Sequence, residues 1–161
     1  MNVTSTARNV RMSPKKVREV TRQIQGMPIA DAQAVLSAIP RKSARLVAKT
    51  LKTAIADAEH IRSEWSEGDV QNRVAEIKQD IENHTKEDGE LHRKYRHLPG
   101  KLARLESYLD SEHKLAEGKL TVREAVVGAA TPLRRWRTRA RGGGSPIIKR
   151  TSHIRITLSD E

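Results

Sequence analysis

A chain of 161 residues with a formal net charge of +11 and an isoelectric point near 10.3 can form one domain with an insertion, or two very small domains. The positive excess predicts a polyanionic partner, either nucleic acid or an anionic membrane surface. The lack of cysteine excludes a disulfide framework and a thiolate metal site. Because no secretory signal is visible and no run approaches the roughly 20 apolar residues that cross a bilayer, we expect an intracellular, cytoplasmic protein without a membrane partner.

Charge divides the chain into three parts. Residues 1–60 carry a net charge of +7, residues 61–119 carry −2, and residues 120–161 carry +6. The middle part also holds three of the four aromatic residues, Trp65, Tyr95 and Tyr108. We therefore predict a basic domain formed by residues 1–61 and 119–161, interrupted by an insertion at residues 62–118. Its core must be built from aliphatic side chains and is expected to be thin.

Two helices are expected in the first forty residues. Ser13 and Pro14 form a start signal, with serine as N-cap and proline at the first helical position, and Gly26 fits the position just after the end. The apolar face of this helix consists of Val17, Val20 and Ile24. The second helix follows Pro28 and repeats apolar residues at helical spacing. These are Ala32, Val35, Leu36 and Ile39.

The third predicted helix, after Pro40, combines an apolar stripe with a cationic one. The apolar stripe continues over about four turns and consists of Ala44, Val47, Ala48, Leu51, Ile55 and Ala58. The cationic stripe follows the spacing i, i+3, i+7, i+10 and consists of Lys42, Arg45, Lys49 and Lys52. A solvated polar face would explain these cations, but no acid follows them until Asp57, which favours contact with phosphates.

The middle segment has its own helical periodicity. One apolar repeat consists of Val70, Val74, Ile77 and Ile81, and a second, after Pro99 and Gly100, consists of Leu102, Leu105 and Leu109. The intervening HTKEDGE, residues 84–90, is typical of an exposed turn. We predict an antiparallel helical hairpin. Its sequence favours a solvated bulge over a specific contact with a neighbouring protein or RNA.

Two strands are predicted near the carboxyl end, at residues 120–127 and 154–158. In the second, Ile154, Ile156 and Leu158 alternate with polar residues, as expected for a half-buried strand. The first is irregular at residues 125–127, which allows for a bulge. The strands flank residues 131–153, which makes this segment the distal part of a long hairpin.

The segment between the strands holds five arginines in eight positions and no acid: Arg134, Arg135, Arg137, Arg139 and Arg141. In a helix they would surround the whole circumference and leave no apolar face, which argues against an amphipathic membrane helix. In a strand, the four odd-numbered arginines lie on one side, with Trp136, Thr138 and Ala140 on the other. Trp136 fits two roles equally, stacking on a base or packing against the other arm.

The turn of this hairpin is predicted where glycine tolerates a positive φ. The residues concerned are Gly142, Gly143, Gly144, Ser145 and Pro146. Arms of about 10 to 12 residues, at about 3.3 Å each, would project roughly 33–40 Å. A two-stranded ribbon is marginal in water, and this one repels itself, so we expect order when it is embedded in something anionic. Arginine suits such a partner because it binds phosphate bidentately and stacks on bases. A DNA surface would need a much shorter projection, so the long ribbon favours folded RNA.

Three motifs carry a resemblance: VRMSPKKVREV (10–20), LVAKTLKTAIADAEH (46–60) and IIKRTSHIRITL (147–158). They resemble bacterial large-subunit ribosomal protein twenty-two over about residues 7–60 and 120–159, and the intervening block is absent from typical members. The resemblance implies an α/β (α+β) fold with three helices packed on a small three-stranded antiparallel sheet. It also implies a first strand at Arg8–Met12 and a long hairpin, at about residues 128–153, that lines the polypeptide exit tunnel.

The resemblance further implies the partners: large-subunit rRNA, neighbouring large-subunit proteins and the nascent polypeptide, without homo-oligomerisation. At the first strand and helix, the residues expected on rRNA are Arg8, Arg11, Lys15, Lys16 and Arg18. On the hairpin they are the five arginines with Lys149 and Arg150, and hydrogen bonds are expected from Thr151, Ser152 and His153. The tip departs from the family, which usually carries further charges at the positions of residues 143–146.

Two other function classes compete with a ribosomal protein. An enzyme is disfavoured because the histidines include no HExxH pair and the glycine run lacks the lysine and helix of a P-loop. His92 and His97 lie among lysines and arginines that would oppose a bound cation. We therefore predict no catalytic site, no metal site and no cofactor. A free nucleic-acid-binding module, such as an architectural protein or RNA chaperone, fits the composition and would wash off as salt competes.

Overall fold

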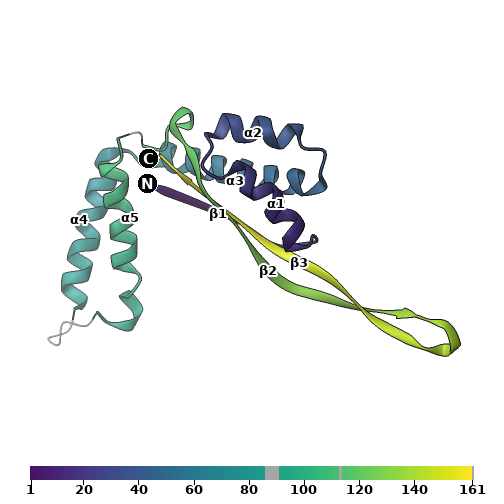
Figure 1. Cartoon of the computed structure of the whole chain (residues 1–161). Coiled ribbons are helices and arrows are strands. Elements are labelled where there is room, and N and C mark those ends of the chain that lie inside the picture. Colours follow the sequence, from purple (N-terminus) through teal and green to yellow (C-terminus); the bar gives the residue numbers. More distant parts are fainter. Residues whose placement is uncertain (86–90, 113, 161) are drawn as a thin grey trace.

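A three-stranded antiparallel sheet forms the centre of the structure, and helices cover one side of it (Figure 1). Strand β1 (Asn2–Val10) lies at one edge, β2 (Thr121–Thr138) at the other, and β3 (Gly144–Ser159) pairs with both. This computed structural model describes residues 1–85, 91–112 and 114–160. The predicted fold class, helices packed on a small three-stranded antiparallel sheet with a long hairpin, is confirmed.

The first strand begins earlier than predicted. It covers Asn2–Val10 rather than Arg8–Met12, and it pairs with β3 from Asn2 opposite Ser159 to Val10 opposite Ser152. Its apolar content is low, since Val3 is its only fully buried residue, so the local sequence gave little sign of a strand. The pairing with β3, more than 140 residues away, makes it one.

Helix α1 (Pro14–Ile24) follows the predicted signals. Ser13 is at the N-cap position, although its side chain accepts no capping hydrogen bond, and Pro14 is the first helical residue. Gly26 adopts a φ of +81°, which favours glycine, and its N–H donates to the Val122 carbonyl at 2.7 Å. The end of α1 is thereby attached to strand β2.

Helices α2 (Ile29–Ala38) and α3 (Lys42–Glu64) complete the body. Helices α1 and α3 pack on the sheet, and α2 packs on α3. The core between them is aliphatic, as predicted. Its fully buried members include Val17, Val20, Ile24, Val47, Leu51, Ile154, Ile156 and Leu158. Each such side chain contributes about 1.5–3 kcal/mol on burial.

The predicted helical hairpin is formed by α4 (Glu67–His84) and α5 (Leu98–Asp110), which pack against each other. Val70, Val74, Ile77 and Leu105 are buried between them. Pro99 and Gly100 lie within the first turn of α5 rather than before the helix. The predicted turn at residues 84–90 falls mostly outside the described residues. Two short 3₁₀ helices, η1 (Arg93–Tyr95) and η2 (Glu117–Lys119), precede and follow α5.

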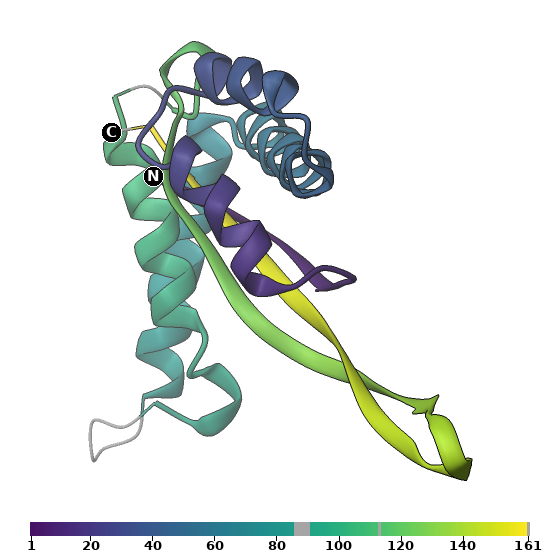
Figure 2. The same ribbon diagram turned by 45° about the vertical axis from the view of Figure 1, so that its right-hand side comes forward.

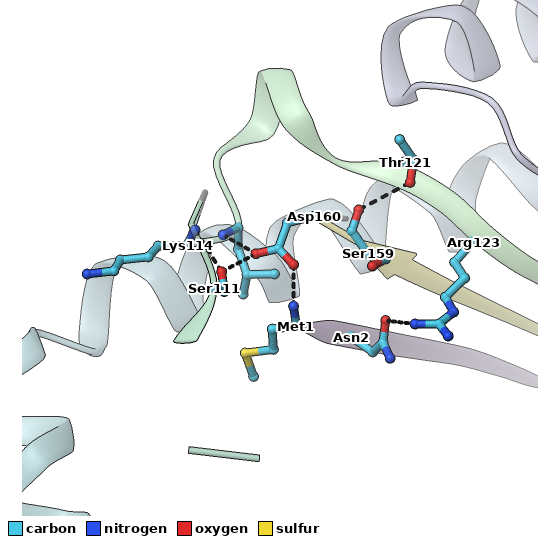
Figure 3. Close-up of polar contacts among 9 residues, drawn as sticks. Met1, Asn2, Ser111, Lys114, Thr121, Arg123, Ser159 and Asp160 are labelled. Carbon is cyan, nitrogen blue, oxygen red and sulfur yellow. Dashed lines mark hydrogen bonds and ion pairs between the residues drawn. The ribbon is translucent and has the colours of Figure 1, made fainter. Parts of the chain in front are cut away.

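The base of the helical hairpin is joined to the sheet through Asp160 (Figure 3). Its carboxylate accepts hydrogen bonds from the Ser111 hydroxyl at 2.5 Å and the Leu115 N–H at 3.1 Å, and it pairs with the Met1 ammonium group. Burial favours the neutral acid, but these donors outweigh it and lower the pKa of Asp160 below its ordinary value. A charged, hydrogen-bonded carboxylate therefore fastens β3 to the segment after α5.

The helical hairpin and the β2–β3 arm extend in different directions (Figures 1 and 2). The helical hairpin lies beside the two chain ends, whereas the arm extends from the opposite end of the sheet. The predicted boundary at residue 61 falls inside α3, which continues to Glu64. Trp65 and Tyr108, whose rings meet edge to face at 5.2 Å, pack at this junction.

Candidate nucleic-acid interface

The arm is a two-stranded ribbon beyond the end of β1. Strands β2 and β3 continue alone from the pair Ala130–Thr151 to the pair Thr138–Gly144. At about 3.3 Å per residue, the eight steps along β2 correspond to about 26 Å before the turn. The projection is shorter than predicted because β1 covers β3 up to Ser152. We refer to residues 131–150 as the ribbon.

Cations occupy both faces of the ribbon. Residues opposite each other in an antiparallel pair share a face, and Leu133 pairs with Lys149 while Arg135 pairs with Ile147. Alternation then puts three cations on that face: Arg135, Arg137 and Lys149. The other face carries Arg134 and Arg150 with Trp136 and Ile148. The prediction that Arg135 and Arg137 lie on the opposite face of the strand from Trp136 and Thr138 is confirmed.

The turn lies earlier than predicted. Strand β2 ends at Thr138, and the short helix η3 (Ala140–Gly142) follows. The Arg139 N–H donates to the Gly143 carbonyl at 2.8 Å, and both Arg141 and Gly142 have positive φ angles. The predicted turn at residues 142–146 is therefore wrong: residues 144–146 belong to β3, and Arg139 and Arg141 lie in the turn rather than on a strand face.

Gly144 is required by Trp136 rather than by the turn. A Cβ atom at position 144 would lie 2.1 Å from the Trp136 Nε1 and 2.4 Å from its Cε2, so only glycine fits beneath the indole. The ring packs against the other arm, one of the two roles that the sequence allowed. The side chain remains 69% exposed, which leaves much of its surface available to a partner.

The ribbon cations have no acidic partners in the part of the chain that the structure describes. Within the described residues, no carboxylate forms an ion pair with any lysine or arginine of the ribbon. Neighbouring arginines on one face are about 6.6 Å apart along the strand and repel by about 0.6 kcal/mol per pair in water. The helical hairpin differs, since its Arg73 pairs with Glu76 and its Lys78 with Glu106. The ribbon therefore carries positive charge that an external anion can neutralise.

Four cations converge on a hollow at the root of the ribbon. This hollow, of about 220 Å³, lies beside the irregularity in β2 between Ala130 and Leu133. Its lining includes Arg11, Arg135, Lys149 and Arg150, together with Leu133 and Thr151. The fold thus brings Arg11, which follows β1, against residues more than 120 positions later. Such a cluster of guanidinium and ammonium groups is suited to a phosphate.

A family model described as ribosomal protein L22p/L17e matches residues 5–86 and 91–159. The chain belongs to this family. Three curated relatives are all named large ribosomal subunit protein uL22. The relative from Opitutus terrae is 32% identical over 160 residues, which cover 99% of this chain and 96% of the relative. The relative from Lactobacillus gasseri is 30% identical over 96% of this chain and 89% of the relative, and that from Lactobacillus delbrueckii subsp. bulgaricus is 29% identical over 96% and 88%.

The predicted resemblance to the L22p/L17e family is therefore confirmed. The matched ranges include most of residues 62–118, so the division of the chain into a domain and an insertion stays a prediction. We keep the word insertion for residues 62–118 as a label.

In this L22p/L17e member, the predicted contacts of the body are solvent-exposed. Arg8 lies on β1, and three further cations lie on α1: Lys15, Lys16 and Arg18. One of them, Arg18, also donates to the Val127 carbonyl at 3.3 Å, which directs its side chain toward β2.

The cationic stripe of α3 forms a separate exposed surface. Arg45 and Lys52 line a groove of about 690 Å³ between α2 and α3, and this groove shares no residue with the hollow at the ribbon root. The family member thus presents two basic surfaces, the ribbon with its root and the α3 stripe.

Two of the predicted hydrogen-bonding residues are turned into the protein. Thr151 and Ser152 are buried, with 6% and 0% of their surfaces exposed, and the Thr151 hydroxyl donates to the Thr131 carbonyl. His153 is half-buried, and its Nδ1 accepts from the Asn9 N–H at 3.2 Å. The side chains of Thr151 and Ser152 therefore belong to the packing of the ribbon root, and we leave both out of the proposed RNA contact.

Sequence reasoning missed one cation on the open face of the sheet. Arg155 is exposed between the buried Ile154 and Ile156, and it pairs in register with Thr6 and Val126. The alternation in β3 indicated that this side chain faces away from the core, and that signal was available from the sequence. No group of three or more metal-ligating side chains, and no helix able to span a membrane, occurs among the residues described.

Proposed function

We propose that this chain binds large-subunit rRNA through the ribbon, the hollow at its root and the α3 stripe, and that the ribbon lines the polypeptide exit tunnel. As an L22p/L17e member it is a structural, non-enzymatic constituent of the large ribosomal subunit, which in bacteria is cytoplasmic. Its association with neighbouring large-subunit proteins follows from the same membership. The RNA contacts and the tunnel position are our inference from the charge and shape of the arm.

The observation that carries the proposal is the unpaired positive charge of the ribbon. A free soluble protein gains nothing from arginines that repel one another on a narrow two-stranded arm. Surrounding phosphates would replace this repulsion with attraction, because each guanidinium can donate two parallel hydrogen bonds to one phosphate. With cations on both faces, the ribbon is suited to a passage enclosed by RNA rather than to a single RNA surface.

The turn is the part that would face the nascent polypeptide. Arg139 and Arg141 project from it, and the Arg139 Nε donates to the Ser145 hydroxyl at 3.0 Å. Thus the tip of this arm carries two cations together with the predicted tip residues 142–146. A polypeptide that passes the tip would meet a compact basic surface.

Co-sedimentation of the full chain with large subunits tests the proposal. We expect near-stoichiometric recovery with the large subunit after a moderate salt wash, with loss of recovery when Arg135 and Arg137 are both replaced by glutamate. A matched variant, Arg73→Glu with Lys78→Glu, makes the same charge change on the insertion and should retain recovery. Predominant recovery outside large subunits, with release that follows the salt concentration, would instead support a free nucleic-acid-binding module.

A further inference from the structure

The insertion carries its own concentration of positive charge at the end far from the body. Residues 91–105 include five lysines and arginines and no acid, and they are bracketed by Glu90 and Glu106. The five are Arg93, Lys94, Arg96, Lys101 and Arg104. This contrasts with the net charge of −2 for residues 61–119 as a whole. We call residues 92–97, with the sequence HRKYRH, the insertion tip.

The insertion tip is a fixed turn. The Tyr95 ring packs against His84 at the end of α4, with ring centroids 3.9 Å apart, and the Tyr95 N–H donates to the His92 carbonyl at 2.8 Å. His92 is attached to α4 in turn, because its N–H donates to the His84 carbonyl at 3.3 Å. The His97 Nδ1 meets the Lys94 carbonyl at 3.2 Å. The backbone that carries the cations is therefore held against the helical hairpin.

Three of these cations are exposed and lack acidic partners among the described residues: Arg93 and Lys94 in the insertion tip, and Lys101 near the start of α5. Among described residues, no carboxylate forms an ion pair with Arg93, Lys94 or Lys101. By contrast, Arg73 and Lys78 on the shaft of α4 are paired with acids. Acids thus neutralise the cations on the shaft of α4, whereas Arg93, Lys94 and Lys101 keep their charge unneutralised, as the ribbon cations do.

The chemistry of this surface favours a polyanion over a protein partner. The large apolar side chains exposed in the described structure are Val126, Trp136 and Ile148, all on β2 or β3 and none in the insertion. A protein interface would need apolar or aromatic anchors in the patch. The half-buried Tyr95 serves the internal packing of the turn instead, with the Lys94 ammonium 5.9 Å from its ring centre. Phosphates need only the exposed cations that the tip supplies.

We propose that the insertion tip and the adjacent start of α5 form a second RNA-binding site, in which Arg93, Lys94 and Lys101 contact the phosphate backbone of large-subunit rRNA. This site rests on the proposed function for the presence of rRNA, but it uses a different surface. The helical hairpin and the ribbon leave the sheet at opposite ends, so a contact at each would hold the protein at two separated points (Figures 1 and 2).

The salt dependence of binding to isolated large-subunit rRNA tests the second site. For the full chain, each phosphate contact contributes about 0.7–0.9 to the slope of log K against log salt concentration, so Arg93→Gln with Lys94→Gln should lower the slope by roughly 1.4–1.8. The control, Arg73→Gln with Lys78→Gln, removes the same charge from exposed ion pairs on the same hairpin and should leave the slope unchanged. Circular dichroism checks that both variants keep their helices.

The second site would be overturned if the tip variant, Arg93→Gln with Lys94→Gln, showed the same salt-dependence slope as the unsubstituted chain. If Arg135→Gln with Arg137→Gln lowered the slope while the tip variant did not, the proposed function would stand and the second site would fail. An equal fall in the tip variant and its control would show non-specific attraction and would also overturn it.

A tethered probe gives an independent measurement. The chain lacks cysteine, and Gly68 and Gly100 both have open space where a side chain would begin. Iron–EDTA attached to Gly100→Cys, beside the tip, should cleave rRNA in assembled subunits more strongly than the same probe on Gly68→Cys, at the base of α4. Cleavage from Thr138→Cys on the ribbon but none from Gly100→Cys would reject the second site alone.

Discussion

The contact between Trp136 and Gly144 gives a sharp prediction for the ribbon. In Gly144→Ala the new methyl group would overlap the indole, since its position lies 2.1 Å from Nε1, so the ring must leave the opposite arm. Trp136 is 69% exposed, which means that about a third of the side chain is covered. If a buried aromatic side chain covers about 150–250 Å², the loss is roughly 50–80 Å², or about 1–2 kcal/mol of ribbon stability.

Acrylamide quenching of tryptophan fluorescence measures this displacement. A Trp65→Phe background leaves Trp136 as the single tryptophan. High salt, near 1 M, shortens the screening length to about 3 Å and suppresses the repulsion between arginines in the free protein. We expect Gly144→Ala to raise the quenching constant toward that of a fully exposed indole. Gly143→Ala is the matched control, because its Cβ would meet the Ala140 carbonyl oxygen at a tolerable 3.4 Å.

Equal quenching in Gly144→Ala and the unsubstituted protein would refute the packing of Trp136 on the opposite arm. A double-mutant cycle sharpens the conclusion. In a Trp136→Ala background the clash is absent, so Gly144→Ala should there cost no ribbon stability beyond its ordinary effect on a strand.

Three further predictions concern assembly, backbone strain and pH. Arg137→Glu should reduce incorporation into large subunits far more than Lys78→Glu. The expected difference is roughly 10- to 150-fold, for the loss of a charge-assisted hydrogen bond worth about 1.5–3 kcal/mol. Competition between tagged variants in cells measures the ratio, and equal incorporation would count against the ribbon as the main RNA-binding arm. Gly26→Ala should lower the free energy of unfolding by about 1–2 kcal/mol, because alanine would have to adopt the φ of +81°. Gly68→Ala, in open space on α4, should instead raise it by about 0.5–1 kcal/mol. Urea unfolding compares the two variants, and an unchanged stability of Gly26→Ala would contradict the backbone strain expected at this position. Because folding lowers the pKa of Asp160, the stability that its carboxylate contributes is present above its ordinary pKa and is lost as the pH falls through the folded pKa. Urea unfolding between about pH 5 and pH 2 should therefore show a smaller loss of stability in Asp160→Asn than in the unsubstituted protein. An unchanged pH profile in the variant would be inconsistent with this linkage.

The parts of the fold that could be predicted are those encoded within one or two turns of chain. The start of α1 at Pro14 and its end near Gly26 follow from backbone geometry that proline and glycine impose locally. The apolar stripe of α3 and the alternation of Ile154, Ile156 and Leu158 follow from the periods of helix and strand. The character of the ribbon was equally local, because five arginines without an acid define a cationic arm in any extended conformation.

The candidate site could be predicted in its charges but not in its arrangement. No local pattern indicates that Arg11 lies near Lys149 and Arg150, because their proximity depends on the pairing of β1 with β3 and on the irregularity beyond Ala130. The burial of Thr151 and Ser152 depends on the same packing at the ribbon root.

By itself, the sequence determined the helices, the half-buried strand, the excess positive charge and the family, because each depends on residue types and on short spacings between residues. Only the tertiary structure decided that β1 begins at Asn2, that Arg139 and Arg141 occupy the turn, and that Gly144 lies beneath Trp136. These features depend on which distant residue lies opposite each position. Such pairing is selected by the free energy of the whole sheet and core, to which a local pattern contributes one part.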